Sequence, residues 1–281
     1  MALHWPTFFT RLGSAIVFSI IMMAGLLWND YAFLGLTLLI EVLCLRDYFR
    51  LVKKITPDVH WPSWLPLVIQ IVGALLVALS FGALHHPSYL TYAITVAVAF
   101  PIITLLGATL SKKTGWEASA QAFGGILYIT LPAILFLSLR DISIIIPLAL
   151  VLMIWMNDTM AYLVGSFIGK TPFSKISPKK TWEGTAGGAL LTIVGAGIWG
   201  YYSPYYHMTD WMALAACAAV AGTAGDLLES KLKRMADVKD SGTMMPGHGG
   251  ALDRFDSLLV AIPFAFAYAF LFMEQVILKI F

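Results

Sequence analysis

Long apolar stretches alternate along the chain with short polar connections. A helix that crosses the hydrocarbon layer of a bilayer needs about 20 mostly apolar residues. Nine stretches come close to this length, and they cover residues 12–28, 31–45, 65–84, 90–110, 123–139, 142–168, 184–203, 211–228 and 257–276. The pattern predicts an all-α fold, a polytopic membrane helical bundle of about nine transmembrane helices.

The composition supports this prediction. Hydrophobic residues make up 59% of the 281 residues, charged residues only 12%, and the mean hydropathy is +0.80. A soluble domain is about half apolar and about one quarter charged. The composition therefore excludes a cytosolic enzyme, a disordered chain, a secreted disulfide scaffold and a nucleic-acid binder. Because nine spans use about 180 residues, we expect one integral-membrane domain over residues 1–281.

The positions of the basic residues predict the orientation of the spans. If connections alternate between the two sides of the membrane from an inside N-terminus, 16 of the 18 Lys and Arg residues fall on one side. Positive charge is enriched in cytoplasmic connections. The other side holds only Arg140 and Lys279. We therefore predict a multi-pass protein with its basic loops in the cytoplasm.

Two of the predicted inside segments carry candidate chemistry, and both lie in the second half of the chain. The first, residues 157–184, contains Asp158 within or at the end of an apolar stretch, where a carboxylate usually faces a polar cavity. Four lysines and several hydroxyl residues follow in a loop shaped by Gly and Pro, a combination suited to phosphate. They are Lys170, Lys175, Lys179 and Lys180, with Thr171, Ser174, Ser177 and Thr181. A basic loop that only sets topology explains the lysines equally well.

The second segment, residues 225–257, carries carboxylates at the mouths of two apolar stretches. Small residues precede Asp226, which permits close helix packing and directs this carboxylate into the bundle. Asp253 and Asp256 are three residues apart and share one helix face. Carboxylate oxygens are the ligands that Mg²⁺ prefers, so Asp226, Asp253 and Asp256 are candidate metal ligands, with Asp158 as a further candidate. Salt-bridged loop charge is the alternative interpretation.

The second segment closely resembles the signature of the phosphatidate cytidylyltransferases, also called CDP-diglyceride synthetases. Thirteen positions in residues 230–256 match at the family's spacing: Ser230, Lys233, Arg234, Lys239, Asp240, Gly242, Pro246, His248, Gly249, Gly250, Asp253, Arg254 and Asp256. The first segment resembles the family in Ser177 to Thr181 and in Glu183-Gly184. Met245 and Ala251 depart from the usual aliphatic residues without loss of a polar group.

The resemblance implies a reaction in which CTP and phosphatidate give CDP-diacylglycerol and pyrophosphate. It implies Mg²⁺, replaceable by Mn²⁺, with K⁺ as a weaker suggestion. It also implies a bacterial inner membrane, a homodimer, and residues 1–140 as a scaffold for the catalytic loops in residues 141–281. The implied catalytic residues are Asp226, Asp253, Asp256, His248 and Lys239. The implied substrate-binding residues are Lys170, Lys175, Ser177, Lys179, Lys180, Thr181, Ser230, Lys233, Arg234, Gly249, Gly250 and Arg254.

Three other functions are alternatives. A polyprenol or phytol kinase would use related chemistry but does not share the signature over residues 230–256. A CDP-alcohol phosphotransferase resembles D-G-x-x-A-R with further aspartates, and this sequence has no such run. A transporter with an ion site at Asp158 and Asp226 is the alternative from a different class. It is disfavoured because no inverted repeat is evident.

Overall fold

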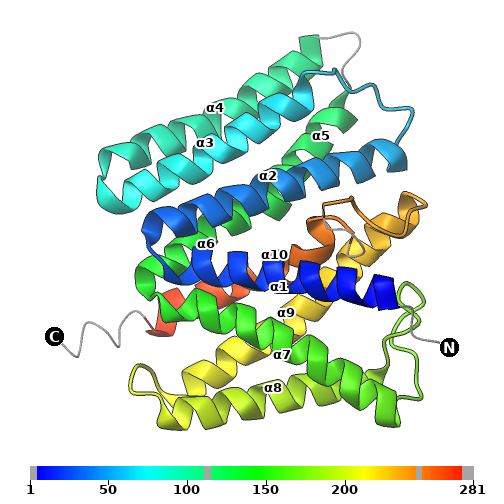
Figure 1. Ribbon diagram of the computed structural model, residues 1–281. Helices are drawn as coiled ribbons and strands as arrows, with labels where there is room; N and C mark the ends of the chain where they lie inside the picture. Colours follow the sequence, from blue (N-terminus) through cyan, green and yellow to red (C-terminus); the bar gives the residue numbers. More distant parts are fainter. Residues whose placement is uncertain (1–4, 111–114, 245–248, 274–281) are drawn as a thin grey trace. The chain divides into compact units, whose positions relative to one another are not determined.

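The computed structural model describes residues 5–110, 115–244 and 249–273, and within these ranges the chain is helical (Figure 1). The first half holds α1 (Trp5–Leu27), α2 (Asp30–Ile55), α3 (Leu65–His85), α4 (Ser88–Leu110), α5 (Trp116–Gly125), the π-helix η1 (Ile126–Thr130) and α6 (Leu131–Ile142). The second half holds α7 (Ile145–Ile168), α8 (Trp182–Tyr202), α9 (Met208–Met235), α10 (Leu252–Tyr268) and the π-helix η2 (Ala269–Met273). One isolated β-bridge, Pro172 to Thr181, interrupts this pattern.

The predicted spans correspond to helical rods in the described ranges. Since α5, η1 and α6 are continuous, as are α10 and η2, nine rods occupy the places of the nine predicted spans. Five of these rods are long and apolar enough to cross a membrane, and α1 and α4 contain shorter apolar stretches, Leu12–Leu27 and Ser88–Thr104. The all-α membrane bundle is confirmed, and the crossing of all nine rods stays a prediction.

Several helices run further than the apolar pattern indicated. Helix α2 begins after Asn29, whose side chain accepts a hydrogen bond from the Ala32 backbone N–H at 2.8 Å. It continues ten residues beyond the predicted end at residue 45, a part that buries Phe49 and Leu51 and ends with Lys53 and Lys54, whose charges interact favourably with the helix dipole. Helix α9 likewise extends to Met235, so residues 225–235 of the predicted loop are helical.

The described chain divides into two compact units, residues 1–137 with 232–255 and residues 138–231 with 256–281. In the first unit, α1 to α4 pack in succession. Its interior includes Phe33 and Phe136, whose rings lie 4.9 Å apart. The buried Glu41 accepts a hydrogen bond from Thr130 at 2.8 Å. The division of the chain at residue 140 stays a prediction.

In the second unit, α7 and α8 pack along each other through small residues. A Cβ on Gly184 would lie 2.7 Å from the Ala161 carbonyl oxygen and 2.9 Å from Gly165 Cα. One turn further on, a Cβ on Gly188 would lie 2.7 Å from Ala161 Cβ. Because these residues are small, the backbones of α7 and α8 come close together at this level.

Candidate functional site

The basic connection between α7 and α8 is folded into a short hairpin-like loop. The backbone N–H of Phe173 donates to the Lys180 carbonyl at 2.8 Å, and the N–H of Trp182 donates to the Thr171 carbonyl at 2.9 Å. The rings of Phe173 and Trp182 meet edge to face, with centroids 4.5 Å apart. This pairing places Lys175, Ser177 and Lys179 at the tip of the loop and Lys180 at its base.

The base of the loop is closed by the first turn of α8. Thr181 caps the helix, since its hydroxyl oxygen accepts from the Gly184 N–H at 3.1 Å. The Glu183 carboxylate accepts the Thr171 hydroxyl at 2.8 Å and the backbone N–H groups of Lys170 and Thr171 at 3.1–3.2 Å. Its own backbone N–H, followed by the Thr171 hydroxyl and N–H, lowers the pKa of Glu183 from its ordinary value near 4.5 to about 2. Glu183 precedes the predicted span 184–203, so these bonds order the loop outside the membrane.

This lowered pKa predicts a pH dependence of loop stability. Because the folded pKa lies below the unfolded one, the contribution of Glu183 is complete above about pH 4.5 and is lost as the pH falls towards 2. The unfolding temperatures of the wild type and of Glu183→Gln should therefore differ at pH 7, approach each other below about pH 4.5 and converge only near pH 2. Thermal unfolding in detergent across this range checks it, and a difference that stays constant with pH would contradict the role of the charge.

An ion pair joins this loop to α9 within the second unit. Lys180 Nζ lies 2.6 Å from Asp226 Oδ2, and the two side chains are 30% and 29% exposed. The Oδ2 atom itself is inaccessible to solvent. The Oδ2 atom of Asp226 is therefore shielded from solvent and already paired with a cationic group, and the orientation of Asp226 towards the bundle stays a prediction.

Helices α9 and α10 approach closely beside Asp226. A Cβ on Gly225 would collide with the backbone carbonyl of Asp256, and a Cβ on Gly222 would lie 3.5 Å from Ser257 Cβ. The same Gly222 position lies 4.0 Å from Ile154 on α7. Three helices thus meet at this level, and Asp226 lies one turn beyond it along α9.

Two further polar residues lie on these helices at the same level. Asp256 is 7% exposed, and its Oδ1 accepts from the Ser257 N–H at 2.6 Å. Asn157, one turn beyond Ile154, is 5% exposed, and its Oδ1 has no hydrogen-bond partner among the described residues. Buried polar oxygens without partners are rare, so the Asn157 amide oxygen is a candidate to bind a cation.

In the first unit, Asp253 holds the loop that precedes α10. Its Oδ2 accepts from the Ser241 N–H at 2.8 Å, the Ser241 hydroxyl at 2.9 Å and the Gly250 N–H at 2.7 Å. Its Oδ1 pairs with Lys233 Nζ at 2.7 Å. The bond to Gly250, three residues back, resembles the second half of a capping box. The structure therefore gives both Asp253 and Lys233 a role in shaping this loop.

Asp47 of α2 is a site residue that sequence analysis missed. It is 7% exposed, and its Oδ2 accepts from the Leu252 N–H at 3.2 Å and from the Ser241 hydroxyl at 3.3 Å. A Cβ on Gly242 or Gly250 would collide with its carboxylate. The sequence does contain one signal, because Asp47 is an acid beside an apolar stretch.

Gly249 has a backbone conformation that favours glycine. Its φ of +85° lies in the left-handed region, which side chains other than glycine rarely adopt. A Cβ there would also lie 2.6 Å from Asp253 Oδ2. The glycines of the signature therefore let the backbone pass between two carboxylates.

The remaining predicted residues, apart from His248, are also among the described residues. Ser230 follows the buried Glu229 near the end of α9. The exposed ones are Asp158, Lys170, Lys175, Lys179, Arg234, Lys239 and Arg254. His248 lies outside the described residues.

The predicted metal ligands do not form one cluster within either unit. Asp226 and Asp256 belong to the second unit and Asp253 to the first. Among the described residues, no group of three Asp, Glu, His or Cys side chains could hold a metal ion. The donors that are present nevertheless fit Mg²⁺, because they are hard oxygen ligands and Asp226 already holds the Lys180 ammonium group. The metal site stays a prediction.

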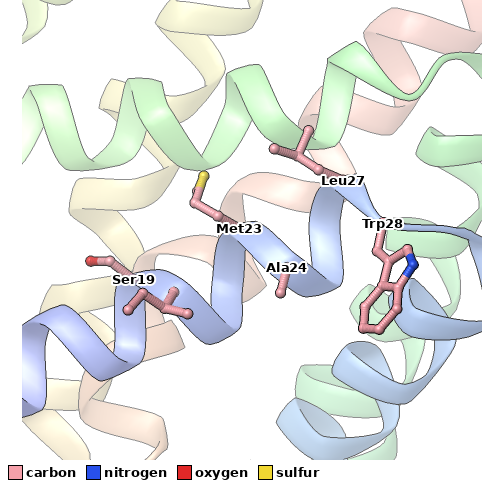
Figure 2. A pocket seen from close by; sticks show the side chains of 6 residues that line it. Ser19, Met23, Ala24, Leu27 and Trp28 are labelled. Carbon is pink, nitrogen blue, oxygen red and sulfur yellow. The ribbon is translucent and has the colours of Figure 1, made fainter.

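A hollow on α1 contains none of the candidate residues. Figure 2 shows its lining along one side of the helix, from Ser19 to Trp28. The hollow has a volume of about 590 Å³ and is almost entirely apolar. It offers no chemistry for charged substrates and is typical of a surface that meets lipid.

Comparisons with known proteins agree with the motifs. The cytidylyltransferase family matches residues 9–272. A phosphatidate cytidylyltransferase of Bacillus subtilis (strain 168) is 45% identical over 124 residues, which cover 42% of this chain and 45% of that protein. One of Aquifex aeolicus is 35% identical over 177 residues, covering 62% and 66%.

A third relative is matched over more of its length. The phosphatidate cytidylyltransferase of Staphylococcus aureus (strain COL) is 33% identical over 202 residues, which cover 70% of this chain and 76% of that protein. The matches to the Bacillus and Aquifex proteins span less than two thirds of those relatives. From the extent of the family match and the Staphylococcus alignment, the chain belongs to the cytidylyltransferase family.

Proposed function

We propose that this chain is a phosphatidate cytidylyltransferase, which converts CTP and phosphatidate into CDP-diacylglycerol and pyrophosphate. The observation that carries the proposal is the ion pair between Lys180 and Asp226 beside the backbone of Asp256. It joins the basic loop to the acidic helix ends in one unit of a membrane protein. Basic groups for phosphate, acids for a cation and an apolar surround suit a nucleotidyl transfer to a lipid.

The main physical difficulty of this reaction is charge. A phosphate monoester has a second pKa of about 6, so the lipid phosphate is mostly a dianion at neutral pH and needs no general base. CTP adds about four negative charges, so about six must be brought together. An oxygen of the lipid phosphate forms a bond to the α-phosphorus of CTP, and the bond to the β,γ-pyrophosphate breaks.

The basic residues would offset the negative charge of the two substrates. Lys175 and Lys179 at the loop tip are exposed and can meet the polyphosphate, while Lys180 at the base is positioned by Asp226. Substrate-binding roles are also proposed for Lys170, Ser177, Thr181, Ser230, Lys233, Arg234, Gly249, Gly250 and Arg254, and catalytic roles for His248 and Lys239. These groups act by holding the two phosphates in line and stabilising the charge of the transition state.

The acidic residues would hold a divalent cation. Asp226 and Asp256 are the proposed ligands, and Asn157 adds a buried amide oxygen. Asp253 and Asp158 stay candidate ligands, although Asp253 already accepts four donor contacts in the loop. When bound, Mg²⁺ or Mn²⁺ would act as a Lewis acid on the phosphate oxygens. A role for K⁺ rests on the family resemblance alone.

The same proposal includes an orientation. Because most of the basic residues fall on one predicted side, we place the catalytic loops in the cytoplasm and the protein in a bacterial inner membrane. A homodimer is supported only by the family resemblance. Light scattering of the protein in detergent would measure its oligomeric state.

A direct assay of the reaction tests the proposed function. Purified protein in detergent, given phosphatidate and CTP labelled at the α-phosphate, should form labelled CDP-diacylglycerol. It should release an equal amount of unlabelled pyrophosphate. A polyprenol or phytol acceptor, tested with CTP labelled at the γ-phosphate because a kinase transfers that group, should take up no label. Absence of label from CDP-diacylglycerol would contradict the proposal. Ion flux in proteoliposomes without use of CTP would favour the transporter alternative.

A further inference from the structure

An apolar pocket of about 410 Å³ lies in the first unit between α1 and α2. Its walls are α1 from Gly13 to Met22 and α2 from Leu36 to Leu43, and Ser14 is its one polar lining residue. The α1 wall runs over ten residues, or about 13.5 Å along the helix axis. We call this space the α1–α2 pocket.

The end of the α1–α2 pocket is formed by the signature region. Met244 of the loop and Phe255 of α10 complete its lining. Phe255 follows Asp253 by two residues, and its ring lies 5.6 Å from the ring of Phe18 on α1. An apolar space therefore adjoins the segment that carries the signature charges, within one unit.

We propose that the α1–α2 pocket receives an acyl chain of phosphatidate while the lipid phosphate lies at the signature region. A molecule that reaches both places must have a phosphate and a long apolar chain joined by a short linker. Phosphatidate is such a molecule, and free CTP is not. This inference rests on the proposed function and extends it to the part of the lipid that does not react.

The pocket would orient the substrate more than it would increase affinity. Lipid tails are as apolar as leucine side chains, so moving an acyl chain from the bilayer into the pocket gains little hydrophobic free energy. A chain held between two helices nevertheless restricts where the phosphate can lie. Binding contacts far from the reacting atoms lower the barrier by such positioning. The enzyme is therefore expected to prefer phosphatidate of a particular acyl-chain length.

Gly13 offers a way to fill the pocket without disturbing the fold. A Cβ at this position would meet no atom within 4 Å, and Gly13 lines the pocket. Gly35 on α2 is a matched control, since its Cβ would also meet nothing within 4 Å and it does not line the pocket. Because glycine is less favourable than other residues inside a helix, neither Gly13→Phe nor Gly35→Phe should lower stability.

The test compares chain lengths in detergent. Gly13→Phe should lower kcat/KM for dipalmitoyl phosphatidate about tenfold relative to dihexanoyl phosphatidate, as a hydrophobic pocket does when its shape changes. Gly35→Phe should leave this ratio unchanged. An unchanged ratio in Gly13→Phe, or an equal loss with both lipids, would overturn the acyl site. Absence of turnover in the wild type would instead overturn the proposed function.

A second readout does not depend on turnover. Phosphatidate with a photoreactive group at its chain end should label residues 13–22 or 36–43 of the full-length protein. Gly13→Phe should reduce that labelling and Gly35→Phe should not. Equal labelling of these residues by a matched phosphatidylcholine probe would show that bulk lipid occupies the pocket and would contradict the proposal.

Discussion

Asp226→Asn should lower kcat by about 10²–10³-fold, the size of effect seen when one group that stabilises transition-state charge is lost. The variant keeps the shape of the side chain, and its amide oxygen can still accept a hydrogen bond from Lys180. What it removes is the negative charge that pairs with Lys180 and that we propose as a cation ligand. Steady-state kinetics with phosphatidate and CTP measure the change.

The stability of the variant separates this role from a structural one. Because Asp226 and Lys180 are each about 30% exposed, loss of their pairing should change the unfolding temperature only slightly. Asp58→Asn is a suitable control, since it removes an exposed acid from a connection outside the site. Full turnover in Asp226→Asn, or an equal loss in Asp58→Asn, would contradict the role of Asp226.

The second large effect is expected at Asp253, and here activity and stability should fall together. Asp253→Asn places an amide where Oδ1 and Oδ2 now accept from Lys233, Ser241 and Gly250. Asp253 is 5% exposed at its side chain, so the variant leaves the Lys233 charge largely buried without its partner. Breaking a buried pair in this way costs about 3–5 kcal/mol.

A double-mutant cycle shows whether the pair is the cause. Thermal unfolding and turnover should be measured for Asp253→Asn, for Lys233→Met and for the double variant. A coupling free energy of about 1–3 kcal/mol is expected for residues in direct contact. Additive effects on stability would mean that the contact between Lys233 and Asp253 does not hold the loop.

Sequence periodicity predicted the helices well because each one is a local pattern. The nine apolar stretches correspond to nine rods, and the small residues before Asp226 do pack closely, at Gly222 and Gly225, against α10. The ends of the helices were less accurate, since α2 continues past the apolar stretch to Ile55 through a part that carries charges and also buries Phe49 and Leu51. Apolarity marks the part of a helix that meets lipid, and it does not mark where the hydrogen bonding stops.

Contacts between distant parts of the chain could not be predicted. Asp47 and Ser241 are 194 positions apart and still share a hydrogen bond. No spacing rule links an acid on α2 to the start of α10. The fold of residues 169–181 was also missed, because it depends on backbone pairing at Pro172 and Thr181 and on the Glu183 bonds. The motif residues could be recognised from the family pattern. Their hydrogen-bond partners could be identified only from the structure.

Asp226 and Asp256 are proposed to hold a divalent cation on which transfer from CTP to phosphatidate depends. The most direct test measures Mn²⁺ binding by electron paramagnetic resonance alongside turnover, in detergent, after removal of metal with a chelator. The account predicts no turnover without metal, recovery with Mg²⁺ or Mn²⁺, and loss of bound Mn²⁺ in Asp226→Asn and Asp256→Asn. Undiminished CDP-diacylglycerol formation in excess chelator would contradict it.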